Sequence, residues 1–152
     1  MSTWLIVLLA TIGPLYAAFD TDDFTPSEEE EEETPETPET PVDPTGQTLT
    51  GTEADDTLEG EGLNDTITGE AGNDTLSGAA GADIISGGAG LDFITGGDGN
   101  DTIDAGADAD SVSGGAGEDA IAGGTGDDSI VGGNGADVLD GGDDDDTVRG
   151  GA

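Results

Sequence analysis

Residues 114–140 read GGAGEDAIA, GGTGDDSIV and GGNGADVLD, three nine-residue units with no insertion between them. Each unit begins Gly-Gly-x-Gly, has aspartate at its sixth position and has an aliphatic residue at its eighth. Counted from this stretch, repeat positions 1 to 9 recur over residues 51–149, which is eleven units. A fixed period this short predicts a repeat architecture and outranks local propensity.

Position 6 is an aspartate and position 8 an aliphatic residue in every unit, and glycine recurs at three other positions. Glycine occupies position 1 in ten of the eleven units, and positions 2 and 4 in seven each. The position-6 column consists of Asp56, Asp65, Asp74, Asp83, Asp92, Asp101, Asp110, Asp119, Asp128, Asp137 and Asp146. The position-8 column consists of Leu58, Ile67, Leu76, Ile85, Ile94, Ile103, Val112, Ile121, Ile130, Leu139 and Val148.

The composition excludes several classes of function. The chain has 152 residues, with one Lys or Arg (Arg149) against 37 Asp and Glu, and it has no Cys and no His. Such a chain repels nucleic acid and anionic lipid. It also lacks the usual ligands of zinc, haem and iron–sulfur clusters, and the base or nucleophile of serine and cysteine hydrolases. Oxygen is the only abundant ligand atom, which suits hard cations such as Ca²⁺.

The period itself suggests a fold. The Gly-rich, acidic positions 1 to 6 favour a turn, and positions 7 to 9 favour a very short strand with its aliphatic residue buried. Two units then make one coil of a parallel, all-β roll, with two strands back to back and coils stacked ~4.8 Å apart. Units two apart share an edge, so the aspartates form two rows. Asp56, Asp74, Asp92, Asp110, Asp128 and Asp146 lie on one edge, and Asp65, Asp83, Asp101, Asp119 and Asp137 lie on the other.

Such rows of carboxylates need a cation. Two charges ~5 Å apart repel by ~0.8 kcal/mol in water and by ~3 kcal/mol at an effective dielectric of 20. One buried aliphatic side chain per nine residues returns only ~1.5–3 kcal/mol, which is less than the cost of ordering those residues. We therefore expect the repeats to be disordered without a divalent cation and folded with it. Rows of six and five aspartates have five and four gaps, so nine ions is the geometric ceiling.

The repeat GGxGxDxUx, where U is aliphatic, resembles the repeats-in-toxin (RTX) nonapeptide of exported bacterial proteins. The resemblance covers residues 51–149 and implies a right-handed parallel β-roll that binds calcium between its turns through the position-6 aspartates and turn carbonyls. Several turns depart from the pattern, among them GTEADD (51–56), GEGLND (60–65), AGADAD (105–110) and GGDDDD (141–146). The best sites are expected beside Asp101, Asp119 and Asp137, where every glycine is in place. Position 5, which includes Glu118, is expected to face solvent.

The residues before the repeats divide into two segments. Residues 1–18 contain an apolar run, Trp4 to Ile12, followed by Gly13-Pro14 and Ala17-Ala18, which is typical of a cleaved signal peptide but also allows a short uncleaved anchor. Residues 19–50 contain six consecutive glutamates and Thr-Pro-Glu repeats, which predict a disordered acidic linker, either a stiff spacer or a solvating tail. The roll is assigned to residues 51–152.

These patterns predict a secreted, extracellular calcium-binding module, in the medium or on the bacterial surface, without catalytic activity of its own. Its expected partner is calcium, with no nucleic acid; residues 4–18 could tether it to a membrane or cell surface. One alternative is a fragment of a larger secreted enzyme, toxin or adhesin, because no export signal follows the repeats before Ala152. A weaker alternative is an ice-binding surface, for which only Thr125, Asn64, Asn73 and Asn100 fit the required positions.

Overall fold

The structure, a computed structural model, describes residues 46–152. The expected signal or anchor at 1–18 and the linker as far as residue 45 lie outside these residues. Within 46–152 all regular structure is β, and no helix there could cross a membrane. The strands are β1 (Thr48–Thr50), β2 (Thr57–Glu59), β3 (Thr66–Ala71), β4 (Thr75–Ala80), β5 (Ile84–Ala89), β6 (Phe93–Asp98), β7 (Thr102–Ala107), β8 (Ser111–Ala116), β9 (Ala120–Thr125), β10 (Ser129–Asn134), β11 (Val138–Asp143) and β12 (Thr147–Gly151).

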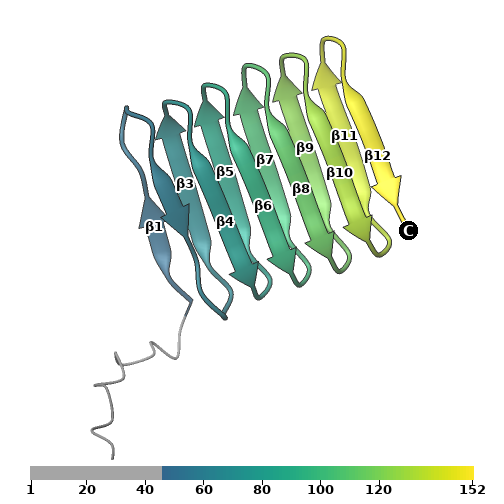
Figure 1. Cartoon of the computed structure of the whole chain (residues 1–152), viewed down its shortest axis with the longest axis horizontal. Helices are drawn as coiled ribbons and strands as arrows, with labels where there is room; N and C mark the ends of the chain where they lie inside the picture. The colour runs from purple at the N-terminus through teal and green to yellow at the C-terminus, as the bar shows by residue number, and fades with distance from the viewer. Residues whose placement is uncertain (1–45) are drawn as a thin grey trace, which may run out of the picture. The chain divides into compact units, whose positions relative to one another are not determined.

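The strands form two parallel sheets of six strands each (Figure 1). Sheet 1 has the order β1-β3-β5-β7-β9-β11, and sheet 2 has the order β12-β10-β8-β6-β4-β2. The chain alternates between the sheets, and residues 18 apart pair within each, as Ile85 does with Ile103. The expected all-β parallel roll with two strands in each coil is therefore confirmed.

The core is the position-8 column. Its eight members from Ile67 to Ile130 are at most 3% exposed, because each packs between coils on both sides. Leu49, Leu58 and Leu139 pack against this cluster but are only partly buried, and Val148 is 44% exposed. Burial thus follows the number of neighbouring coils, as expected for a solenoid in which each repeat contacts only its neighbours.

The strands are longer than the repeat predicts. Strands β3 to β11 have six residues and cover positions 7 to 9 and then positions 1 to 3 of the next unit. The ladder skips position 1: Ser77 pairs with Thr95 and Ala79 with Gly97, while Gly78 is not paired. From residue 70 onward, positions 2 and 4 have positive φ throughout, which allows pairing to resume after the skipped residue. The expectation that positions 1 to 6 form the turn holds for residues 51–56 and 60–65 but was wrong for the later units, where the turn occupies only positions 4 to 6.

The roll also begins earlier than Gly51. Strand β1 pairs with β3, with Leu49 opposite Ile67, so the chain enters sheet 1 before the expected start of the repeats. Leu49 lies nine residues before Leu58 and thus extends the aliphatic column. Residues 46–50 continue the repeat period although they carry no Gly-Gly-x-Gly sequence.

Candidate metal centre

The position-6 aspartates form two ladders along the roll. Each lies immediately before a strand, and the row that begins with Asp56 precedes sheet 2 while the row that begins with Asp65 precedes sheet 1. Except for Asp137 and Asp146, which end the two rows, each aspartate donates its backbone N–H to Oδ1 of the aspartate one coil later, for example from Asp65 to Asp83 (2.7 Å) and from Asp101 to Asp119 (2.9 Å). The structure therefore brings the predicted ligands together in the two rows expected from the sequence.

These carboxyl groups point into the roll. Eight of them are at most 3% exposed: Asp65, Asp74, Asp83, Asp92, Asp101, Asp110, Asp119 and Asp128. Asp56, Asp137 and Asp146, which lie near the ends of the rows, are only partly buried. Position 6 shares the inward face with positions 8 and 1, because side chains alternate along an extended chain.

The second carboxylate oxygen, Oδ2, has no hydrogen-bond partner in most turns. It is buried and unpaired in Asp74, Asp83, Asp92, Asp101, Asp110, Asp119, Asp128 and Asp137. A buried carboxylate oxygen without a donor is costly. A bound cation would remove this cost, so these residues fit a metal.

The two N-terminal turns are different. Asp56 Oδ2 accepts hydrogen bonds from the N–H of Thr52 (2.6 Å) and from its hydroxyl (2.9 Å), and Asp65 Oδ2 accepts one from the N–H of Glu61 (2.9 Å). These turns have Thr52 and Glu61 at position 2, and neither residue has a positive φ. With a negative φ, the position-2 N–H points at the carboxylate. Asp56 and Asp65 are thus predicted ligands whose Oδ2 is already satisfied by protein groups.

A backbone carbonyl lies near each unpaired oxygen. A Cβ added to Gly114 would lie 2.3 Å from Asp119 Oδ2 and 2.6 Å from the carbonyl oxygen of Gly132, one coil later. A carboxylate oxygen and a carbonyl oxygen of neighbouring coils therefore flank the same small space, which a side chain at position 1 would fill. Ala105, fully buried, is the one residue at position 1 that has a side chain.

Burial and like charge act on the same carboxyl groups. Burial, with the neighbouring carboxylates of the row, raises the pKa of Asp101 and of Asp110 from 3.8 to about 6, although the N–H of the preceding aspartate works against this rise. The pKa values of Asp83, Asp92, Asp119 and Asp128 are also raised, chiefly by burial. A cation placed in the rows would oppose both causes.

The donor set indicates which metal fits. No group of three or more acidic side chains in residues 46–152 is placed to hold an ion by itself. Each turn contributes one inward carboxylate, so backbone carbonyls would have to complete the coordination. Ca²⁺ accepts six to eight such oxygens in flexible geometry, whereas Mg²⁺ demands a tighter octahedron and gives up its water reluctantly.

Position 5 carries a second ladder that the sequence did not predict. Its side chains lie at the surface, and Glu118 is exposed as expected. Yet Oδ1 of Asp55, Asn64, Asn73, Asn100 and Asp127 each accepts a hydrogen bond from the position-5 N–H one coil later, at 2.8–3.0 Å. The signal available in the sequence was that Asn or Asp fills position 5 in six of eleven units.

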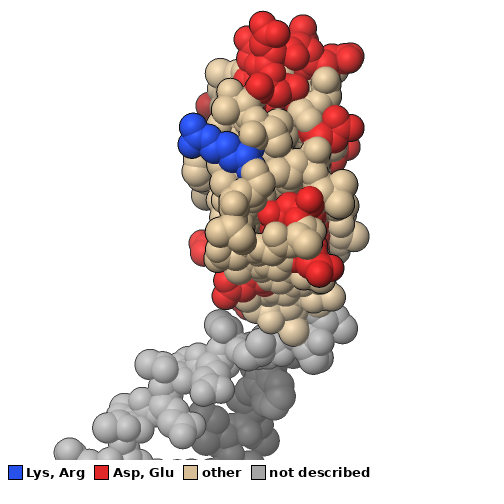
Figure 2. Space-filling view, turned by 90° about the vertical axis from the view of Figure 1, so that its right-hand side faces the viewer, with Lys and Arg blue, Asp and Glu red and all other residues tan. Residues whose placement is uncertain are grey.

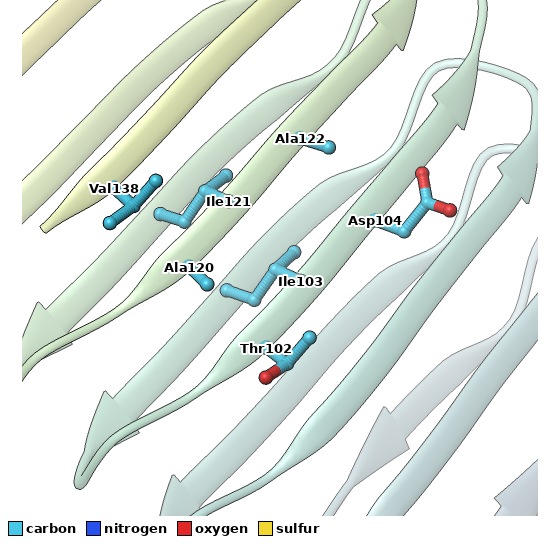
Figure 3. Close-up of a pocket in the computed structure, with 7 residues that line it drawn as sticks. All are labelled: Thr102, Ile103, Asp104, Ala120, Ile121, Ala122 and Val138. Atoms are coloured by element: carbon cyan, nitrogen blue, oxygen red, sulfur yellow. The ribbon is translucent and has the colours of Figure 1, made fainter.

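A surface hollow in the described part of the chain is not a comparable site. A hollow of about 260 Å³ lies over residues 102–104 of β7, 120–122 of β9 and Val138 of β11, where the small Ala120 and Ala122 leave space (Figure 3). Asp104 is the one ionisable residue that lines it, so it holds no pair of acid–base groups. Figure 2 shows acidic side chains in separate groups on one face of the roll, with uncharged surface between them.

Comparison with known proteins agrees with this geometry. A family model described as the RTX calcium-binding nonapeptide repeat matches residues 50–85, 59–94, 86–121 and 122–152. No curated protein matches the chain. The matched segments together cover residues 50–152, about two thirds of the sequence, and include both rows of aspartates. The chain belongs to the family of RTX calcium-binding nonapeptide repeat proteins.

Proposed function

We propose that this protein is an exported module that binds calcium between its turns and folds by doing so, without catalytic activity of its own. The eight buried, unpaired Oδ2 atoms carry this proposal, because a divalent cation is the partner that such a row of carboxylate oxygens lacks. The proposed ligands are the position-6 aspartates, with turn carbonyls completing each site.

The unpaired oxygens also suggest how many ions bind. We call the space between neighbouring position-6 aspartates of one row a gap. Asp74, Asp92, Asp110 and Asp128 border three gaps, and Asp83, Asp101, Asp119 and Asp137 border three more. Six gaps thus have an unpaired Oδ2 on both sides, three fewer than the geometric ceiling of nine; in one of the six, between Asp110 and Asp128, the buried Ala105 side chain leaves less room for an ion. The gaps next to Asp56, Asp65 and Asp146 are weaker candidates.

Calcium supplies the folding energy in this proposal. The aspartates must lie within one coil spacing of one another to form the ladders, and their mutual repulsion opposes that arrangement. Ligation replaces the repulsion with attraction, so binding and folding become one process. The raised pKa values of Asp101 and Asp110 are consistent with carboxylates held close together away from water.

Circular dichroism of the full-length chain tests calcium-dependent folding. In EDTA the spectrum should be that of a coil, and calcium at ~10⁻⁴–10⁻³ M should restore β signal, whereas equal magnesium should not. Equilibrium dialysis at saturating calcium should count about six ions per chain, one for each gap that has an unpaired Oδ2 on both sides. A β spectrum that survives the chelator would rule out calcium-dependent folding.

Export rests on separate observations. RTX repeats are typical of exported bacterial proteins, and residues 1–18 have the pattern of a signal peptide. Mass spectrometry of protein recovered outside the cells should find a chain that begins near Ala18 and lacks Trp4. Recovery of the full-length chain only from the cytoplasm would argue against export.

A further inference from the structure

The two ladders of the roll run in opposite directions. At position 6, the N–H of one coil donates to a side chain of the next coil, as from Asp101 to Asp119. At position 5, the side chain of one coil accepts from the N–H of the next, as Asn100 does from Glu118 (2.9 Å). Two hydrogen bonds of opposite direction therefore join the two turns of a gap where position 5 is Asn73 or Asn100, and we call that gap tied.

Only two of the six fully bordered gaps are tied in this way. Asn73 ties the gap between Asp74 and Asp92, and Asn100 ties the gap between Asp101 and Asp119. In the other four gaps, position 5 of the first turn is Ala82, Leu91, Ala109 or Glu118. The alanine and leucine side chains have no acceptor atom, and the Glu118 side chain does not make this bond. The six gaps thus have similar carboxylates, but only two of them have a position-5 hydrogen bond between their two turns.

We infer that the position-5 Asn and Asp side chains are positioning residues for the calcium gaps. This inference rests on the proposed function. Their Oδ1 atoms contact backbone N–H groups, and the residues are exposed, so they act on the ion only through the spacing of the turns. An ion that bridges two turns binds more tightly when the turns are already at the required separation, because less ordering accompanies binding.

The expected effect is small for one bond and measurable for two. An ordinary hydrogen bond is worth roughly a factor of five in an equilibrium constant. Two bonds then give a factor of about 25, which shared among six cooperatively bound ions is about 1.7-fold in calcium concentration. The pair Asn73→Ala and Asn100→Ala should raise the calcium midpoint of folding by this factor. The pair Ala82→Asn and Ala109→Asn, which supplies acceptors for two untied gaps, should lower it by the same factor.

Conservative variants separate positioning from general loss of stability. Asn73→Asp with Asn100→Asp keeps the acceptor oxygen, as the natural Asp55 and Asp127 do, and should leave the midpoint at or below that of the wild type. Amide exchange in saturating calcium gives a local readout. The Glu118 N–H should lose protection in Asn100→Ala and keep it in Asn100→Asp, whereas the N–H of Ala136, next in the same row and untied, should be unchanged in both.

The outcomes are distinguishable from those of the proposed function. If the wild type shows no calcium-dependent β signal, calcium-dependent folding fails and this inference fails with it. If the wild type folds with calcium but the alanine, asparagine and aspartate pairs all share its midpoint, only the positioning role is overturned. Opposite shifts in the alanine and asparagine pairs, with the aspartate pair not raised, support it.

Discussion

The first two turns of the roll and the turns that follow have the same aspartate in the same place but leave it in different states. In turns 51–56 and 60–65, backbone and hydroxyl groups of Thr52 and Glu61 satisfy the Oδ2 atoms of Asp56 and Asp65. From Asp74 to Asp137, each Oδ2 is buried without a partner. The difference follows φ at positions 2 and 4, which is positive in the later turns alone. Positive φ therefore does more than allow a tight turn, because it turns the position-2 N–H away from the carboxylate, and Glu70 and Ala79 adopt it without being glycine.

Removing a carboxylate from the later turns should have the largest effect. Asp119 borders two gaps, so Asp119→Ala should reduce the ion count from about six to about four. Each of these two sites loses a direct ligand and should weaken by at least the ~10–100-fold that loss of an outer-shell partner causes, so the calcium midpoint should rise by at least about two- to fivefold. Calcium titration with equilibrium dialysis measures both quantities.

Two controls sharpen this experiment. Glu118→Ala removes an exposed charge next to Asp119 and should barely move the midpoint. Asp65→Ala should reduce stability, because Gln47 and Glu61 lose their acceptor, but it should leave the ion count at about six. If Asp65→Ala and Asp119→Ala release the same number of ions, the contrast between early and later turns does not govern binding.

Protons should partly replace calcium in the later turns. The pKa of Asp101 and of Asp110 is raised from 3.8 to about 6 in the folded roll, so the fold binds protons more tightly than the unfolded chain does. The calcium-free roll should therefore gain stability as pH falls through about 6, and lose it as pH rises.

Circular dichroism of calcium-stripped protein between pH 7 and pH 5 checks this effect, at pH values above the isoelectric point of about 4.1. The β signal should rise toward pH 5, and substituting Asp101→Asn and Asp110→Asn together should flatten the pH response. A calcium-free spectrum that does not change over this range would mean that these carboxyl groups do not limit folding.

Adding a side chain at a glycine of a later turn should lower the stability of the roll, with a smaller effect than the changes above. Gly117 has φ 137°, and a Cβ there would lie 2.0 Å from the carbonyl oxygen of Gly99. Gly117→Ala should therefore destabilise the calcium-bound roll by ~1–3 kcal/mol, measured by urea unfolding. Gly62, in an early turn, has nothing within 4 Å of an added Cβ, so Gly62→Ala should change stability by less than ~0.5 kcal/mol. Equal losses would show that neither the positive φ of Gly117 nor the nearby Gly99 carbonyl limits the substitution.

Converting an early turn into a later one should have the smallest effect. Thr52→Gly with Ala54→Gly changes GTEADD into GGEGDD and removes the hydroxyl that bonds Asp56 Oδ2. The gap between Asp56 and Asp74 should then bind one more ion, bringing the count from about six to about seven by equilibrium dialysis. Thr52→Ser keeps the hydroxyl and serves as the control. An unchanged count in the glycine variant would mean that positive φ is not sufficient to create a site.

The period of nine was enough to predict the arrangement of the roll. Asp65 and Asp83 could be placed side by side because residues 18 apart must stack when two units make one coil, and the N–H of Asp65 indeed donates to Asp83 Oδ1. Burial of Ile85 and its neighbours followed from the same column, since an aliphatic residue that recurs on one face has to be covered. These features depend on spacing, which the sequence states directly.

Other features depended on backbone conformation, which the sequence does not state. Strands that continue through Gly-Gly, and the start of the roll at Thr48, arise because neighbouring coils supply hydrogen-bond partners that local propensity cannot anticipate. The Asn100 side chain is paired because the Glu118 N–H lies one coil away.

The sequence by itself determined that aspartates stand in two rows around an aliphatic core, because a constant spacing fixes which residues meet. Only the tertiary structure decided which of those aspartates keep an unpaired oxygen. That outcome depends on the direction of single N–H groups, as in the turn that places Thr52 against Asp56, and such directions are set by φ angles and by contacts between coils.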